Sequence, residues 1–171
     1  MTTNERRIQI LSDIKSRGTE PITASDLAKK YGVTRQVIVQ DVALLRAKGN
    51  SIIATPNGYQ FYVPYLSAAS RVIFSKHSTM ALLRQELDTI VSMGGRVLDV
   101  SVEHAIYGEF RAMLMISTTA QVEDFVLRLT ESNDKPLSAV TDGEHYHIIE
   151  AKDEATLDAI ELALGKLGLL M

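Results

Sequence analysis

The order of hydrophobic patterns beyond residue 64 restricts the fold of this chain more than any other feature. Apolar runs of strand length fall at residues 72–74, 97–102, 111–116 and 145–149, and helical periods fall at residues 79–93, 119–130 and 153–166. The resulting order is strand, helix, strand, strand, helix, strand, helix. We therefore predict an α+β domain, a split βαβ-like α/β sandwich (βαββαβα) with helices on one face of an antiparallel sheet.

The first 64 residues show a different pattern, in which three helical periods come before a short hairpin. Residues 3–17 and residues 23–32 each carry apolar side chains at helical spacing, and Thr34 can cap a third helix over the stretch RQVIVQDVALLRAKG. The next stretch, SIIATPNGYQFYV, holds two β-prone runs around a Pro-Asn-Gly turn. Two helices joined by a tight turn and followed by a hairpin predict a winged helix-turn-helix domain.

The change of pattern divides the chain into two predicted domains, residues 1–64 and residues 65–171. The first carries nine Lys/Arg against five Asp/Glu, and the second nine against sixteen, so we expect only the first to meet a polyanion. The chain has no cysteine, which excludes disulfides, thiolate metal ligands and a cysteine nucleophile. Because no apolar run reaches membrane length and the start TTNERR has no signal-peptide core, we expect a cytoplasmic protein without a membrane partner.

The third helical segment supplies candidates for contacts with DNA bases. Burial of Ile38, Val42 and Leu45 on one side would turn the other side outward. Arginine recognises guanine and glutamine recognises adenine, while an exposed valine contacts the thymine methyl group. The DNA-binding candidates are Thr34, Arg35, Gln36, Val39, Gln40 and, in the hairpin, Asn57. The alternative is a module of the same shape that binds protein.

Asp41 lies in the same segment and would repel a phosphate, so we expect it to contact an arginine or a helix end within the protein.

Two histidines, His145 and His147, lie two residues apart in the last predicted strand. Side chains alternate along a strand, so the two imidazoles share one face, roughly 6–7 Å apart, near enough to ligate one metal ion. His77, after the first strand, and Glu86, on the following helix, would join them if the outer strands pair. Such a set suits Zn²⁺, Ni²⁺, Fe²⁺ or Mn²⁺. The alternative is a pair of exposed or hydrogen-bonded histidines without a metal.

Several stretches in combination resemble the niacin-responsive transcriptional repressors of the NiaR type, which join a winged-helix domain to a 3H domain. They are TRQVIVQDVALLRAKGNSIIATPNGY, KHS, QELDTIV, GGRVLDVSVEHAIYGE, KPLSAVTDG and GEHYHIIEA. The resemblance implies a divalent metal held by His77, Glu86, His145 and His147, with nicotinic acid bound near it as co-repressor. It also implies repression of genes for NAD synthesis or niacin uptake by a homodimer on a palindromic operator.

The segment between His77 and Glu86 departs from the family pattern by one additional residue. Glu86 precedes a leucine as the glutamate of the family does, whereas a shift in helical phase would turn Gln85 toward the site instead. We expect His104 or Arg111 to meet the carboxylate of a bound pyridine carboxylate. Two other functions stay open, a metal-dependent hydrolase with a DNA-binding appendage and a regulator that senses the metal itself.

Overall fold

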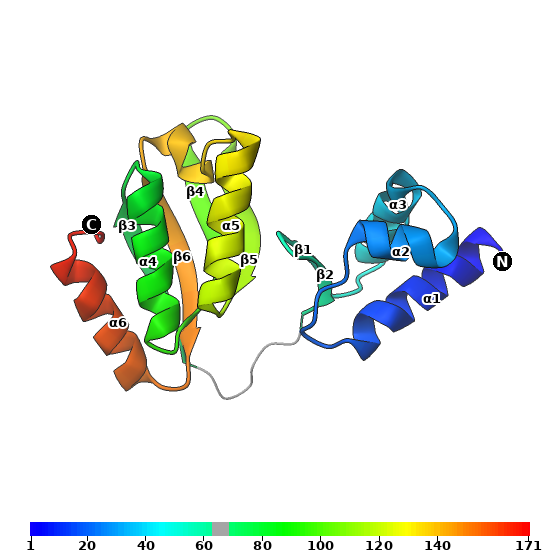
Figure 1. Ribbon diagram of the computed structural model, residues 1–171, viewed down its shortest axis with the longest axis horizontal. Coiled ribbons are helices and arrows are strands. Elements are labelled where there is room, and N and C mark those ends of the chain that lie inside the picture. Colours follow the sequence, from blue (N-terminus) through cyan, green and yellow to red (C-terminus); the bar gives the residue numbers. More distant parts are fainter. Residues whose placement is uncertain (63–68) are drawn as a thin grey trace. The chain divides into compact units, whose positions relative to one another are not determined.

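The computed structural model describes residues 1–62 and 69–171, which form two compact units, Met1–Tyr65 and Leu66–Met171 (Figure 1). Each unit has a hydrophobic core of its own. The predicted domain boundary after residue 64 lies outside the described residues. Within the described residues, none of the helices is both long and apolar enough to cross a bilayer.

The N-terminal unit contains three helices and a two-stranded hairpin. These elements are α1 (Thr3–Ser16), α2 (Ala24–Tyr31), α3 (Arg35–Ala47), β1 (Ile52–Thr55) and β2 (Gly58–Phe61). Thr2, Thr23 and Thr34 cap the helices, since each hydroxyl accepts a backbone N–H of the first turn. Gly32 ends α2 in the left-handed region, at φ 64°. The predicted helix-turn-helix and hairpin are confirmed.

The hairpin is held against the segment that precedes α2. The backbone N–H and C=O of Ile22 both bond to Tyr59 in β2, at 2.9 and 2.8 Å. Gly58 permits this contact, because a Cβ atom there would lie 2.5 Å from the carbonyl oxygen of Ile22. The wing is therefore a fixed part of the N-terminal unit.

The C-terminal unit follows the predicted order and adds one 3₁₀ helix before the last strand. Its elements are β3 (Ala69–Lys76), α4 (Met80–Ser92), β4 (Arg96–His104), β5 (Gly108–Ile116), α5 (Thr119–Ser132), η1 (Leu137–Thr141), β6 (Glu144–Ala151) and α6 (Glu154–Lys166). The strands are longer than their apolar runs, because strand pairing continues beyond the runs into polar residues.

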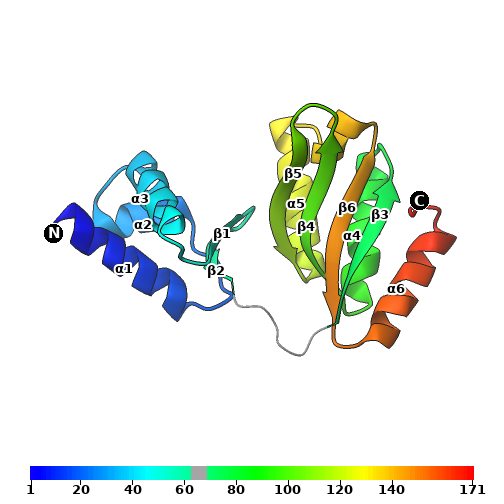
Figure 2. The ribbon, with the colours of Figure 1, turned by 180° about the vertical axis from the view of Figure 1, so that it is seen from behind.

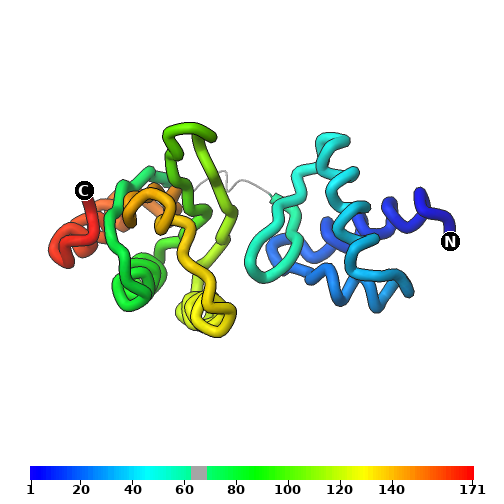
Figure 3. The backbone as a smooth tube through the Cα atoms, turned by 90° about the horizontal axis from the view of Figure 1, so that it is seen from above, coloured from blue at the N-terminus to red at the C-terminus, as the bar shows by residue number. Residues whose placement is uncertain are grey.

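The four strands form one sheet in the order β3-β6-β4-β5, and all neighbours are antiparallel. Strand β6 lies between β3 and β4, and β4 lies between β5 and β6, so both βαβ units are split as predicted. The helices cover one face of the sheet, as Figure 2 shows from the strand side. Helices α4 and α5 lie side by side on that face (Figure 3).

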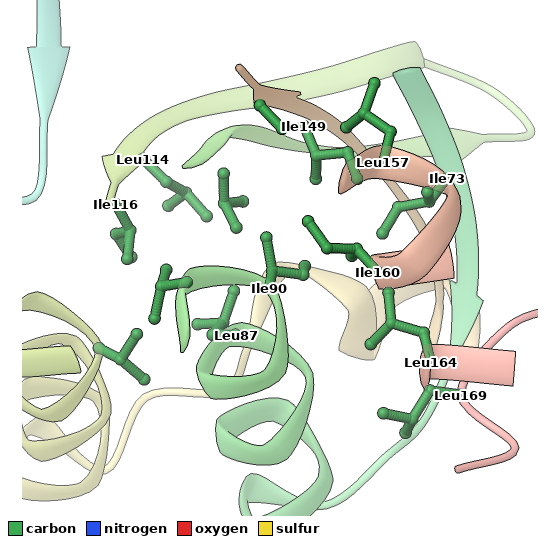
Figure 4. Packing of buried hydrophobic residues seen from close by; sticks show 14 of the residues in the cluster. Ile73, Leu87, Ile90, Leu114, Ile116, Ile149, Leu157, Ile160, Leu164 and Leu169 are labelled. Carbon is green, nitrogen blue, oxygen red and sulfur yellow. The ribbon is translucent and has the colours of Figure 1, made fainter. Parts of the chain in front are cut away.

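The core of this unit lies between the sheet and its helices. Figure 4 shows Ile73 and Ile149 from the sheet meeting Leu87, Ile90 and Ile160 from the helices. These five side chains are at most 2% exposed. The buried face of β6 continues from Ile149 to both histidines of that strand, which therefore sit at one end of the core.

Candidate functional site

The pairing of β3 with β6, the first and last strands of this unit along the chain, forms the candidate site. Ser75 of β3 lies opposite His145 of β6, so the residue two places further, His77, follows β3 beside the start of β6. Glu86 comes from the second turn of α4, which covers this part of the sheet. Pairing of β3 with β6 unites the four side chains, and the sequence prediction depended on this pairing.

All three imidazoles turn their Nε2 atoms toward one oxygen of Glu86. The distances to Glu86 Oε2 are 2.5 Å from His77, 3.1 Å from His145 and 3.5 Å from His147. Each of the four residues is at most 7% exposed. One ligand atom from each of His77, Glu86 and His145 lies within 4.8 Å of the others. Three nitrogens and a carboxylate therefore converge in a site shielded from water.

Two backbone carbonyls orient the histidines of β6. The carbonyl of Gly143 accepts a hydrogen bond from His145 Nδ1 at 2.8 Å, and the carbonyl of Asp99 accepts one from His147 Nδ1 at 2.5 Å. Because a carbonyl only accepts, both Nδ1 atoms carry hydrogen, and Nε2 of each ring is the atom that faces Glu86. This is the arrangement in which histidines ligate metals through Nε2.

Sequence reasoning missed these two carbonyl groups. Gly143 was visible only as part of a turn, whereas Asp99 had a signal, since it is the acidic residue inside the apolar run RVLDVSV. A buried acid in a central strand requires hydrogen-bond donors around it, so an acidic residue at such a position predicts specific polar partners.

The charges of the site reinforce each other. Burial alone raises the pKa of Glu86, but the charge of His147 and hydrogen bonds from His145, His147 and His77 lower it well below its usual range. Burial lowers the pKa of His147, but Glu86 and the carbonyl of Asp99 outweigh it and raise the pKa overall. The Glu86 carboxylate is therefore ionised.

The donor set fits a divalent transition metal. Glu86 Oε1 is buried and, within the described residues, has no hydrogen-bond partner. The hydroxyl of Ser75, opposite His145, is also buried and has no hydrogen-bond partner within the described residues. A buried carboxylate oxygen without a partner is costly, and a cation or its bound ligand would satisfy it. Imidazole and carboxylate together suit Zn²⁺, Ni²⁺, Fe²⁺ or Mn²⁺.

The helical phase of α4 turns Glu86, and not Gln85, toward the histidines. Gln85 lies on the exposed side of the helix, where it lines a shallow surface groove with Arg84 and Asp88. Glu86 is 1% exposed. Glu86 is therefore the residue on the inner face of α4, and the expected alternative, Gln85, is not.

The two residues expected to meet a ligand carboxylate have other partners. His104, at the end of β4, accepts the N–H groups of Ile106 and Tyr107 at its Nδ1. Arg111 on β5 pairs with Asp99 at 2.8 Å and with Glu109 at 2.6 Å. Among the described residues, no hydrogen bond joins His104 or Arg111 to the four converging side chains. In the part of the chain that the structure describes, Arg111 is linked to the site through Asp99, which contacts His147.

The candidate DNA-contacting residues of α3 fall into two groups. Arg35, Gln36 and Gln40 are exposed, as predicted. Val39 was expected to be exposed, but it is half-buried and packs against the core of the N-terminal unit. Full exposure of Val39 is not found, because the apolar stripe of α3 is wider than Ile38, Val42 and Leu45 alone, and its contact with DNA stays a prediction.

The remaining DNA candidates make contacts within the protein. The hydroxyl of Thr34 accepts the N–H of Val37 as the N-cap of α3, and Asn57 donates its N–H to the hydroxyl of Thr55 in the hairpin turn. Thr34 is nevertheless exposed at the helix N-terminus, where phosphates bind well.

Asp41 contacts two arginines, as the sequence indicated. It is 2% exposed, and its two oxygens accept hydrogen bonds from Arg6 and Arg7 of α1, both at 2.7 Å. The pairing ties α1 to α3 and uses two basic side chains of this unit. Positive charge for DNA must therefore come from others, such as the exposed Arg35 and Lys48.

Comparisons with known proteins extend over both units. The family profile of the 3H domain matches residues 70–171, and that of an HTH domain matches residues 6–60. The chain is 39% identical over 170 residues to a probable transcription repressor NiaR of Thermotoga maritima, covering 99% of this chain and 96% of the relative. It is 38% identical over 172 residues to the transcription repressor NadR of Bacillus subtilis, covering 97% and 93%.

Proposed function

The chain belongs to the NiaR/NadR family of transcription repressors, in which an HTH domain is joined to a 3H domain, and we propose that it represses genes of NAD synthesis or niacin uptake, with nicotinic acid as co-repressor. The relatives are regulators and not enzymes, so the hydrolase alternative is set aside. In this proposal the protein acts in the cytoplasm, as a homodimer on a palindromic operator.

The convergence of three imidazole nitrogens on Glu86 is the observation that carries the proposal. His77, Glu86, His145 and His147 would hold one divalent ion. A cation there is supported by Glu86 Oε1, which has no hydrogen-bond partner among residues 1–62 and 69–171. The bound ion would supply a Lewis-acidic position for a pyridine nitrogen or a carboxylate. The metal ligands, the identity of the metal and the ligand are parts of this proposal.

The DNA-binding surface follows from the exposed start of α3. Arg35, Gln36 and Gln40 can enter the major groove, with Thr34 at a phosphate and Asn57 in the wing near the backbone. Val39 is half-buried and stays a candidate for a contact with DNA. An effector changes DNA affinity only if it binds the DNA-competent arrangement of the dimer more tightly than the other arrangements.

Binding of an operator fragment by the full chain tests the function. The fragment is taken from the upstream region of a niacin-uptake or NAD-synthesis gene in the source genome, and affinity is measured with and without nicotinic acid, before and after chelation. We expect nicotinic acid to tighten binding of the metal-loaded protein by roughly 5- to 150-fold, the usual range of allosteric coupling. Nicotinamide and benzoate serve as matched ligand controls.

Each other outcome is informative. An affinity that nicotinic acid leaves unchanged in metal-loaded protein contradicts the niacin response. If the metal alone tightens operator binding, the protein is a sensor of the metal. If chelation changes neither DNA affinity nor nicotinic acid binding, the metal has no part in the response.

A further inference from the structure

Strand β4 departs from regular pairing beside the candidate metal centre. Its register shifts relative to β6 between Val97 and Ser101, and relative to β5 between Val97 and Asp99. Asp99 lies within this bulge in a central strand and is 1% exposed. Bulges redirect individual backbone and side-chain groups and are frequent next to functional sites. The groups redirected here belong to Asp99.

Asp99 uses three acceptor atoms on three different donors. Its backbone carbonyl accepts a hydrogen bond from His147 Nδ1 at 2.5 Å. Its Oδ1 accepts the backbone N–H of Ile148 at 2.7 Å, and its Oδ2 accepts a hydrogen bond from Arg111 at 2.8 Å. Asp99 therefore bonds to the candidate ligand His147, to the backbone of the next residue, Ile148, and to the guanidinium of Arg111 on β5.

The carboxylate replaces a backbone acceptor in the ladder. A backbone N–H on a central strand normally bonds to a carbonyl of the neighbouring strand. At Ile148 the side chain of Asp99 takes that place, so the carbonyl of Asp99 is free for His147. Arg111 offsets the cost of burying the carboxylate charge.

We propose that Asp99 is a positioning residue of the metal centre, whose side chain holds the β4 bulge so that its own carbonyl fixes the ring of His147 with Nε2 toward Glu86. The inference rests on the proposed metal centre. Metal-ligating histidines depend on such partners for ring orientation, and losing one typically weakens metal binding by about 10- to 100-fold.

Two substitutions separate acceptor geometry from charge. Asp99→Ala removes the acceptor for the N–H of Ile148, so the bulge relaxes and His147 loses its carbonyl. Asp99→Asn keeps an oxygen for the N–H of Ile148 but loses both the charge and the acceptor toward Arg111, because its amide nitrogen takes the place of Oδ2. We expect Co²⁺ affinity to fall about 10- to 100-fold in Asp99→Ala and by less than about tenfold in Asp99→Asn. The exposed Asp124 on α5 provides the matched control, Asp124→Ala.

Spectroscopy reports on the ring itself. The visible absorption of bound Co²⁺ should change shape in Asp99→Ala and stay unchanged in Asp99→Asn. In metal-free wild-type protein, NMR should show a slowly exchanging Nδ1–H resonance of His147, and Asp99→Ala should lose it. If Asp99→Ala does not fold, the wild-type resonance carries the test, because its absence would overturn the hydrogen bond from His147 to the carbonyl of Asp99. Arg111→Gln, which alters a half-exposed side chain and its contact with Asp99, should match Asp99→Asn and weaken Co²⁺ binding by less than about tenfold.

The possible outcomes separate a failure of the role of Asp99 from a failure of the proposed metal centre. Wild-type protein that binds no stoichiometric Co²⁺ contradicts the metal centre, while the Nδ1–H resonance still tests Asp99. Wild-type affinity and an unchanged spectrum in folded Asp99→Ala overturn the role of Asp99 alone. Equal losses in the alanine and asparagine variants also overturn it, since they would show that the contact with Arg111 and not the accepted N–H is what matters.

Discussion

Gly143, just before β6, and His77, just after β3, approach each other so closely that only a glycine fits at position 143. The carbonyl of Gly143 accepts the N–H of His77 at 3.2 Å, and a Cβ atom on Gly143 would lie 2.4 Å from the carbonyl oxygen of His77. The same Gly143 carbonyl accepts a hydrogen bond from His145. One peptide group therefore positions two of the proposed metal ligands.

Substitution of Gly143 by alanine should damage the site as well as the fold. Gly143 has φ 91° and Gly94 has φ 89°, but a Cβ atom on Gly94 meets nothing within 4 Å. Both alanine variants should lose roughly 1–2 kcal/mol from the left-handed conformation. Gly143→Ala should lose about 1–3 kcal/mol more from overlap with His77, together with metal affinity.

Thermal unfolding and Co²⁺ titration of Gly143→Ala and Gly94→Ala check this prediction. If the two variants are equally destabilised and bind Co²⁺ equally well, the contact of residue 143 with His77 affects neither stability nor metal binding.

Glu86→Gln should abolish metal retention, because the amide removes the only carboxylate of the proposed ligand set. The loss of metal affinity should exceed the roughly 10- to 100-fold loss that follows when a residue that only hydrogen-bonds to a metal ligand is removed. The metal-free variant should also be less stable, by about 3–5 kcal/mol, because His147 loses its buried partner. Metal content after dialysis and denaturant unfolding measure both effects. Gln85→Ala is the control, and if it loses metal instead, the ligand assignment is incorrect.

The stability of the N-terminal unit should decline in acid because of Asp41. Burial alone raises the pKa of Asp41, but hydrogen bonds from Arg6 and Arg7 overcome this and lower it. A lowered folded pKa contributes stability that is present above the unfolded value, near 3.9, and is lost as pH falls through the folded value. Asp41→Asn should cost about 1–3 kcal/mol at pH 7 and flatten the acid decline.

Amide hydrogen exchange in α1 and α3, measured between neutral and acid pH, tests the role of Asp41. Glu20→Gln removes an exposed carboxylate of the same unit and should leave the pH profile unchanged. A profile of Asp41→Asn as steep as that of the wild type would rule out Asp41 as its source.

Arg35→Ala should weaken binding to the operator more than binding to random DNA. A base contact by this exposed residue at the start of α3 would contribute about 1–3 kcal/mol of discrimination. Arg46, in the last turn of the same helix, is the control, and Arg46→Ala should reduce both affinities equally. Fluorescence anisotropy at fixed salt measures the affinities of the wild type and both variants for the operator and for random DNA. Equal losses in Arg35→Ala would instead identify a phosphate contact.

Local patterns predicted most of the fold. The helices, the strand order along the chain and the wing all followed from hydrophobic period and from caps such as Thr34 and Gly32. Val39 is less exposed than expected because the width of a buried helix stripe depends on what packs against it, which a single-helix pattern does not contain. The contact of Asp41 was expected from charge, but its arginines, 34 and 35 residues away, were not.

The sequence by itself determined that His145 and His147 share one face of a strand, because side-chain alternation is a property of each strand alone. The tertiary structure decided the rest of the site. Pairing of β3 with β6 brought in His77, the phase of α4 brought in Glu86, and the bulge at Asp99 turned a carbonyl to His147. These are contacts between residues far apart in the chain, selected by packing of the whole sheet and not by any local pattern.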